Sequence, residues 1–188
     1  MKTEHKLAET LKEMMAEMPV DEISVTTLAK KCHVNRQTFY YHFHDIYDLL
    51  TLVFLDETIS GVDEVNTVEE LIVCIFNYYE KNRKFIDAAN NSAAKDLFEE
   101  FIYNVTYKTI LRIVNDQKES KKLHHNDRKS IARFYAQAYS HSIVYYLSTY
   151  KNKTLDGLLS CFLFESKNNF AEAVERMLVI RGKEQHHD

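Results

Sequence analysis

The stretch Ser24–His44 reads SVTTLAKKCHVNRQTFYYHFH and decides how the first part of the chain folds. Ser24 and Asn35 are good N-caps, so the pattern predicts two short helices joined by a three-residue turn, one ending near Lys31 and the other spanning Arg36–Phe43. Neither helix is long enough to be stable alone. Two such helices packed around a tight turn are typical of a helix-turn-helix. Their predicted inward face consists of Leu28, Ala29, Cys32, Val34, Phe39 and Phe43.

The second predicted helix carries polar side chains away from this core. A helix-turn-helix presents such residues, at the start of its second helix, to base edges in the major groove. Arg36 can form a bidentate pair with guanine, and Gln37 with adenine. Hydroxyl and imidazole donors nearby suit phosphate oxygens, which fix the register of a protein on DNA. The expected DNA-binding residues are Thr26, Thr27, Asn35, Arg36, Gln37, Thr38, Tyr40, Tyr41, His42 and His44.

The charge of this segment favours an anionic partner. The whole chain has a net charge of −4, which argues mildly against nucleic acid, but the local distribution matters more. No acid lies between Ile23 and His44, whereas residues 1–22 carry six. Some roles stay open, because Tyr41 could pack on the first helix and His42 and His44 could be ordinary surface residues. The bases and histidines of the segment are Lys30, Lys31, Arg36, His33, His42 and His44.

Composition predicts an all-α protein. The 188 residues include only three glycines and one proline, too few for an all-β sandwich, a Rossmann sheet or a glycine-rich phosphate loop. Three widely spaced cysteines without a Cys-x-x-Cys pair argue against disulfides and zinc, so we expect no metal. Residues 1–13 lack the apolar core of a secretory signal, and no apolar run reaches membrane-spanning length. We therefore expect a cytoplasmic protein without a membrane partner.

The same residues carry a family resemblance. The runs Ile23–Ala29 and Val34–Phe43, followed by Leu49 and Leu50, resemble the DNA-binding domain of the tetracycline-repressor (TetR) family over roughly Lys6–Phe54. The block that starts at Asn35 is similar to the subset that includes the dihydroxyacetone-kinase regulators. This resemblance implies a homodimer with a three-helix DNA-binding domain and a six-helix C-terminal domain for ligand binding and dimerisation.

Two positions depart from the family pattern. His33 occupies a turn position that is commonly glycine in the family, and a histidine there would tolerate a positive φ at some cost in strain. Ile46 stands where the family commonly has a lysine that contacts a phosphate. We expect His44 or Tyr47 to replace that contact only in part, so that DNA affinity is weaker and depends less steeply on salt than is usual in the family.

The rest of the chain predicts seven more helices, which makes nine in total. Their predicted caps include Asp45, the capping box Thr67–Glu70, and Asn126 or Asp127. A joint at Gly61–Asn66 suggests a DNA-binding domain at residues 1–60 and a ligand-binding and dimerisation domain at 61–188. The second domain is rich in tyrosine, which is explained by core packing or by a ligand pocket whose polar groups need partners. The candidate pocket residues are Asn77, Tyr78, Phe101, Asn104, Tyr107, Tyr135, Gln137, Tyr139 and His141.

The last two predicted helices suggest a dimer. Residues 134–150 carry no charge on any face, so a helix there should be buried all round. Thr154 should cap a final helix that runs from Leu155 to about Val179 with a long apolar stripe. We expect a two-fold dimer in which these helices form a four-helix bundle. The alternative is that both helices are buried within one chain.

These observations favour a dimeric transcription regulator that binds a near-palindromic operator and is modulated by a small molecule or a co-regulator protein. An enzyme is disfavoured, because the sequence contains no phosphate-loop, dinucleotide, zinc-protease or nucleophile-elbow motif. No cofactor is expected. The alternative is a helical adaptor of the same fold that binds a protein partner rather than DNA, which the net acidity and the missing lysine leave open.

Overall fold

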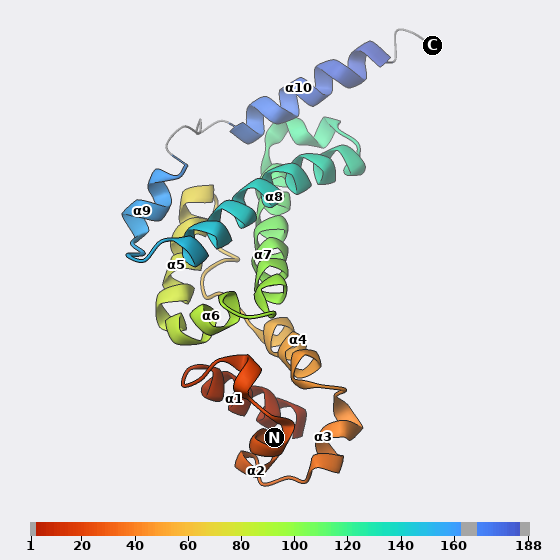
Figure 1. Cartoon of the computed structure of the whole chain (residues 1–188). Helices are drawn as coiled ribbons and strands as arrows, with labels where there is room; N and C mark the ends of the chain where they lie inside the picture. Colours follow the sequence, from red (N-terminus) through yellow and green to blue (C-terminus); the bar gives the residue numbers. More distant parts are fainter. Residues whose placement is uncertain (1–2, 163–168, 185–188) are drawn as a thin grey trace. The chain divides into compact units, whose positions relative to one another are not determined.

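The computed structural model describes residues 3–162 and 169–184 and is all helical within them, which confirms the predicted fold class (Figure 1). The described part holds ten α-helices and two 3-10 helices, and no strand. None of its helices is long and apolar enough to cross a membrane. The elements are α1 (Thr3–Met15), η1 (Val20–Glu22), α2 (Val25–Lys31), α3 (Arg36–His42), α4 (Ile46–Asp56), α5 (Val68–Lys81), α6 (Arg83–Asn90), α7 (Lys95–Asp116), η2 (Lys118–Lys122), α8 (His125–Thr149), α9 (Leu155–Ser160) and α10 (Asn169–Glu184).

Packing divides the described residues into two compact units. The first unit contains the residues up to Ile59 together with Asn77–Phe101, and the second contains Ser60–Phe76 and the residues from Ile102 onward. The first unit thus includes α6 and one end each of α5 and α7. The sequence assigned these segments to the C-terminal domain, and the functional division at residue 60 stays a prediction.

Side-chain caps begin the helices at the predicted places. The Asn35 Oδ1 atom accepts from the backbone N–H of Thr38 at 2.7 Å, which fixes the start of α3. At the start of α5, Thr67 Oγ1 accepts from the N–H of Glu70, whose carboxylate accepts from the N–H of Thr67 in return. This is the predicted capping box. The other confirmed caps are Ser24, Asp45 and Thr154.

The core of the first unit joins the short helices to α6 and α7. Leu7 and Leu11 of α1 are completely buried, as are Leu28, Phe39, Leu49 and Leu50 of the next three helices. Burying one such side chain contributes about 1.5–3 kcal/mol, which compensates for the low stability of helices this short. The Phe54 ring of α4 lies 5.4–6.0 Å from the rings of Phe85, Phe98 and Phe101. This aromatic cluster explains why Asn77–Phe101 belongs to the first unit.

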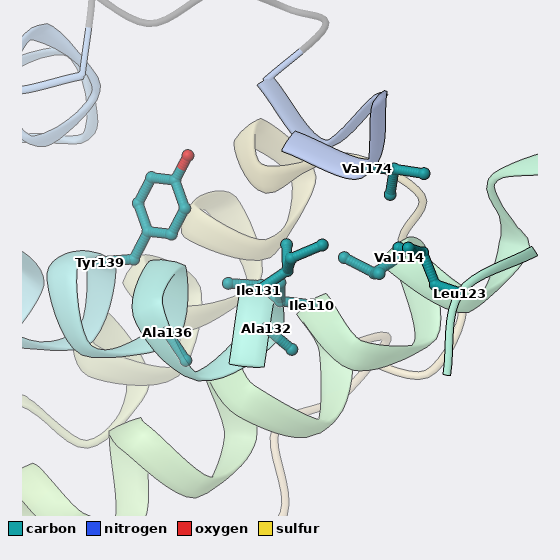
Figure 2. Packing of buried hydrophobic residues seen from close by; sticks show 8 residues of the cluster. All are labelled: Ile110, Val114, Leu123, Ile131, Ala132, Ala136, Tyr139 and Val174. Carbon is teal, nitrogen blue, oxygen red and sulfur yellow. The ribbon is translucent and has the colours of Figure 1, made fainter. Parts of the chain in front are cut away.

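The second unit packs α7, α8 and α10 around an aliphatic cluster (Figure 2). Val174 of α10 faces Val114 and Ile131, and the Tyr139 hydroxyl points away from these aliphatic side chains. A charged pair adds to this packing, because the Arg181 Nε atom donates to both oxygens of the buried Asp127 carboxylate at 3.1 and 3.2 Å. Arg181 therefore fastens α10 to the first turn of α8.

Three predictions about the C-terminal helices are corrected. The single final helix is two, because α9 ends at Ser160 and α10 begins at Asn169, while residues 163–168 lie outside the described part. α8 begins before the predicted caps Asn126 and Asp127, and Asp127 bonds to Arg181 instead. α8 is not buried all round, because Phe134 and Tyr145 are exposed on one face of it.

Candidate nucleic-acid interface

The turn between α2 and α3 is closed by backbone hydrogen bonds. The N–H of Cys32 donates to Leu28 O at 2.9 Å, and the N–H of Val34 donates to Ala29 O at 2.9 Å. His33 lies between them with φ at +56°, in the left-handed region that favours glycine. The positive φ considered for His33 is therefore present.

One face of α3 is fixed in the core. Phe39 is completely buried and Phe43 nearly so, with ring centroids 5.7 Å apart. Their spacing of four residues places them on the same side of the helix, as predicted. The predicted inward face is confirmed except at Val34, which is only half-buried. With Phe39 and Phe43 turned inward, the opposite face of α3 is left toward solvent.

The exposed face of α3 begins with Arg36 and Gln37. Both side chains are exposed, and among the described residues neither makes a hydrogen bond. The Arg36 guanidinium lies 5.9 Å from the centroid of the Tyr40 ring, a cation–π contact that leaves its N–H donors unused. Tyr40 is 50% exposed and Tyr41 is 85% exposed, so Tyr41 does not pack on the first helix. The start of α3 thus presents an unused guanidinium and an unused amide to solvent.

Other predicted residues have partners within the chain. The Asn35 carboxamide oxygen accepts from both the N–H and the hydroxyl of Thr38, so these side chains organise the start of α3. His42 turns toward α1, and its Nδ1 atom lies 3.1 Å from a Glu4 carboxylate oxygen. At the start of α2, Thr27 bonds through its N–H and hydroxyl to Ser24, whereas Thr26 is exposed. These contacts organise the starts of α2 and α3 and hold His42 against α1, whereas the Thr26 side chain stays exposed.

The start of α4 lacks the basic contact of the family. Ile46 is buried, and the exposed His44 uses its backbone N–H to donate to the Asp48 carboxylate at 3.0 Å. The Tyr47 hydroxyl donates to Asp21, and this hydrogen bond raises the pKa of Tyr47 to about 12. The Tyr47 hydroxyl proton is therefore engaged by an acid of the same chain.

The candidate pocket residues are not gathered in the interior. Four polar members that were expected inside are exposed, namely Asn77, Asn104, Gln137 and His141. Tyr78 and Phe101 belong to the first unit, where their rings lie 5.5 Å apart. In the second unit, Tyr107 and Tyr135 pack against the aliphatic cluster, which contains Tyr139.

A polar group in the first unit was not foreseen from the sequence. The Glu57 carboxylate, which follows α4, accepts from the Lys12 ammonium of α1 and from the Tyr78 hydroxyl of α5, the latter at 2.8 Å. Burial, together with the Glu57 carboxylate, raises the pKa of Tyr78. The three residues lie far apart in the sequence, and no local motif signals that they meet.

Fold and site together define an all-helical chain in which α2 and α3 are joined by a tight, hydrogen-bonded turn. Residues 66–158 match a TetR-type family model described as "transcriptional regulator C-terminal region". The chain therefore belongs to the TetR family of transcription regulators, as the runs Ile23–Ala29 and Val34–Phe43 predicted.

One solved structure agrees at the level of the fold. The dihydroxyacetone kinase operon activator DhaS is 19% identical, with a TM-score of 0.61 over 92% of this chain and 96% of that one. A search of curated proteins found no match.

Proposed function

We propose that the chain is a homodimeric regulator that binds a near-palindromic operator through α3. The exposed Arg36 and Gln37 at the start of that helix carry the proposal. Their guanidinium and amide match the donor and acceptor patterns of guanine and adenine in the major groove. Residues 1–60 would form the DNA-binding domain, and residues 61–188 the domain for dimerisation and modulation.

The surroundings of α3 support a duplex as the partner. The exposed Lys30, Lys31 and Arg36 lie in a segment without acids, which favours phosphate oxygens. The nearby acids Asp21 and Asp48 are engaged by donors of their own chain. The phosphate contacts would come from exposed side chains, chiefly Thr26, Tyr40, Tyr41 and His44.

Selection of bound fragments from random duplex DNA tests this proposal. The expected product is a near-palindrome whose half-sites lie about 34–36 Å apart, or about 10–10.5 base pairs, because two recognition helices enter successive major grooves. Binding should weaken steeply with salt, since counterions are released from the phosphates. If no sequence is enriched and duplex binding shows no salt dependence, the chain is an adaptor for a protein partner instead.

The exposed face of α8 supports the dimer. Phe134 is 69% exposed and Tyr145 is 55% exposed, and the exposed Ala138 and His141 lie between them at helical spacing. Large apolar side chains aligned on one exposed helix face mark an interaction site. Two small residues of α8, Ala132 and Ala136, face inward, where they join the cluster with Val174. A second copy of the chain would cover the exposed face across a two-fold axis.

Sedimentation of the Phe134→Glu variant tests the dimer. The variant should sediment as a monomer and lose operator affinity, because a carboxylate would be buried at the interface without a partner. Leu55→Glu, at an apolar residue that is 74% exposed on α4, is the matched control and should remain dimeric. A Phe134→Glu variant that stays dimeric would exclude this face.

The C-terminal domain is the proposed place of modulation. Tyr103 and Tyr107 stack with centroids 6.0 Å apart, and Tyr135 and Tyr139 stack with centroids 6.2 Å apart. Tyrosine side chains supply both apolar area and a polar tip for a ligand. A ligand that binds the folded state raises the unfolding temperature, so a thermal-shift screen with Tyr107→Ala as the negative variant tests the assignment.

A further inference from the structure

The first unit contains a cleft that the proposed function does not use. It lies between α1 and the junction of α5 with α6, two segments that pack side by side (Figure 1). Its volume of about 500 Å³ falls in the range of small-molecule sites, roughly 300–1,000 Å³. The cleft is lined by Glu9, Lys12, Glu13 and Ala16 on one side and by Lys81, Asn82, Arg83, Lys84 and Phe85 on the other.

The two walls carry opposite charges. α1 contributes the exposed carboxylates of Glu9 and Glu13, which lie one turn apart, whereas the opposite wall contributes the exposed ammonium groups of Lys81 and Lys84. Within the described residues, none of these four groups has an ion-pair partner inside 4 Å. The cleft thus offers two unpaired carboxylates on one wall and two unpaired ammonium groups on the other.

The other two cations of the lining are already engaged. Lys12 pairs with Glu57 and lies 5.2 Å from the centroid of the Phe85 ring. Arg83 pairs with Glu80, which precedes it by three residues, and its guanidinium lies over the Tyr79 ring. These pairs hold the lining in place and leave the free charges of the cleft balanced.

We propose that this cleft binds a small zwitterion, with its ammonium group toward Glu9 and Glu13 and its carboxylate or phosphate toward Lys81 and Lys84. A molecule with one charge would meet repulsion at one wall, whereas a zwitterion meets attraction at both. The site lies in the first unit, and its binding of a zwitterion does not depend on DNA.

Calorimetric titration of the full chain with phosphoethanolamine and γ-aminobutyrate tests the proposal. Each zwitterion is compared with its halves, which are ethanolamine with inorganic phosphate and n-butylamine with n-butyrate. At least one zwitterion should bind with a stoichiometry of one per chain, and about three- to tenfold more tightly than either half, since the second charged contact adds to the first. The zwitterion that binds more tightly shows whether the cleft prefers a phosphate or a carboxylate.

Charge-neutralising variants locate the binding. Glu9→Gln/Glu13→Gln and Lys81→Gln/Lys84→Gln change exposed side chains, so both should keep the unfolding temperature of the parent. Each should weaken zwitterion binding about three- to tenfold. The matched control is Lys121→Gln, at a lysine exposed outside the cleft, which should bind as the parent does.

Two results would overturn the proposal: neither zwitterion binds more tightly than its halves, or the cleft variants bind as the control does. Operator affinity of the same variants, measured separately, distinguishes failure of this site from failure of the proposed DNA binding.

Discussion

Arg36→Ala is the sharpest test of the proposed recognition helix. The guanidinium is exposed and touches its own chain only at the Tyr40 ring, so it brings all its donors to a base at little cost to the fold. A bidentate pair with guanine is worth about 1–3 kcal/mol, which corresponds to roughly a 5- to 150-fold loss of operator affinity. The free energy of unfolding should fall by less than about 1 kcal/mol, the value of an exposed cation–π contact.

The assay compares affinities for the selected operator and for random duplex DNA over a series of salt concentrations. A base contact made by Arg36 predicts that the variant loses affinity for the operator and tolerates any base at one position of each half-site. Its affinity for random DNA and its salt slope should match those of the parent. Lys31→Ala, which removes an exposed charge from α2, is the control that should weaken both kinds of DNA alike.

An equal loss on operator and random DNA, with the salt slope reduced by about one, would show that Arg36 contacts a phosphate. Unchanged affinity for both would refute the placement of α3 in a groove.

Three further outcomes are expected. Tyr40→Phe should weaken binding to every duplex about two- to tenfold in a filter or fluorescence assay, because it removes one hydrogen bond from an uncharged hydroxyl to a phosphate. A changed base preference would contradict this role. His33→Gly should raise the free energy of unfolding by about 0.5–1 kcal/mol in urea denaturation, because the strain that it removes from the folded state exceeds the entropy that glycine adds to the unfolded chain. A lower free energy of unfolding would show that His33 is not strained. Arg181 lowers the pKa of Asp127, so the pair stabilises the fold at neutral pH, and this stability is lost as the pH falls through the lowered pKa. Asp127→Asn should therefore cost about 1–2 kcal/mol at pH 7 and little in strong acid, which urea titration at both pH values would measure.

The elements that the sequence predicted well are those set by neighbouring residues. Ser24, Asn35 and Asp45 each cap a helix through an N–H three residues further on, so the signal and its partner lie in the same short window. The left-handed φ of His33 likewise follows from a turn of fixed length. Local chemistry therefore sufficed to predict the helix-turn-helix.

The C-terminal elements depended on distant partners. Asp127 resembled a helix cap, but its carboxylate bonds to Arg181, 54 residues away. Gly157 interrupts the apolar stripe of α9, where an added Cβ would lie 2.3 Å from the Tyr146 hydroxyl. That hydroxyl bonds to both backbone groups of Thr154, a contact that no local pattern indicates.

The candidate site was predicted only in part, because some of its contacts are also made with distant residues. Periodicity identified Phe39 and Phe43 as inward, and the opposite face followed from it. Periodicity did not reveal that His42 turns to Glu4, because the position of α1 is set by packing. The exposure of Asn77 and the other polar candidates has the same cause, since helical spacing alone does not say which face meets a neighbouring helix.

Helix α1 connects the proposed recognition helix to the zwitterion cleft within the first unit. Glu4, at the start of α1, pairs with His42 of α3, and Lys12, near its end, pairs with Glu57 after α4. Exposed ion pairs are worth only about 0–1 kcal/mol, so the completely buried Leu7 and Leu11 provide most of the attachment of α1. Because this core is close-packed, α3 moves with α1 rather than independently of it. The cleft and α3 are therefore attached to one rigid core, so that any displacement of α1 would be shared by α3.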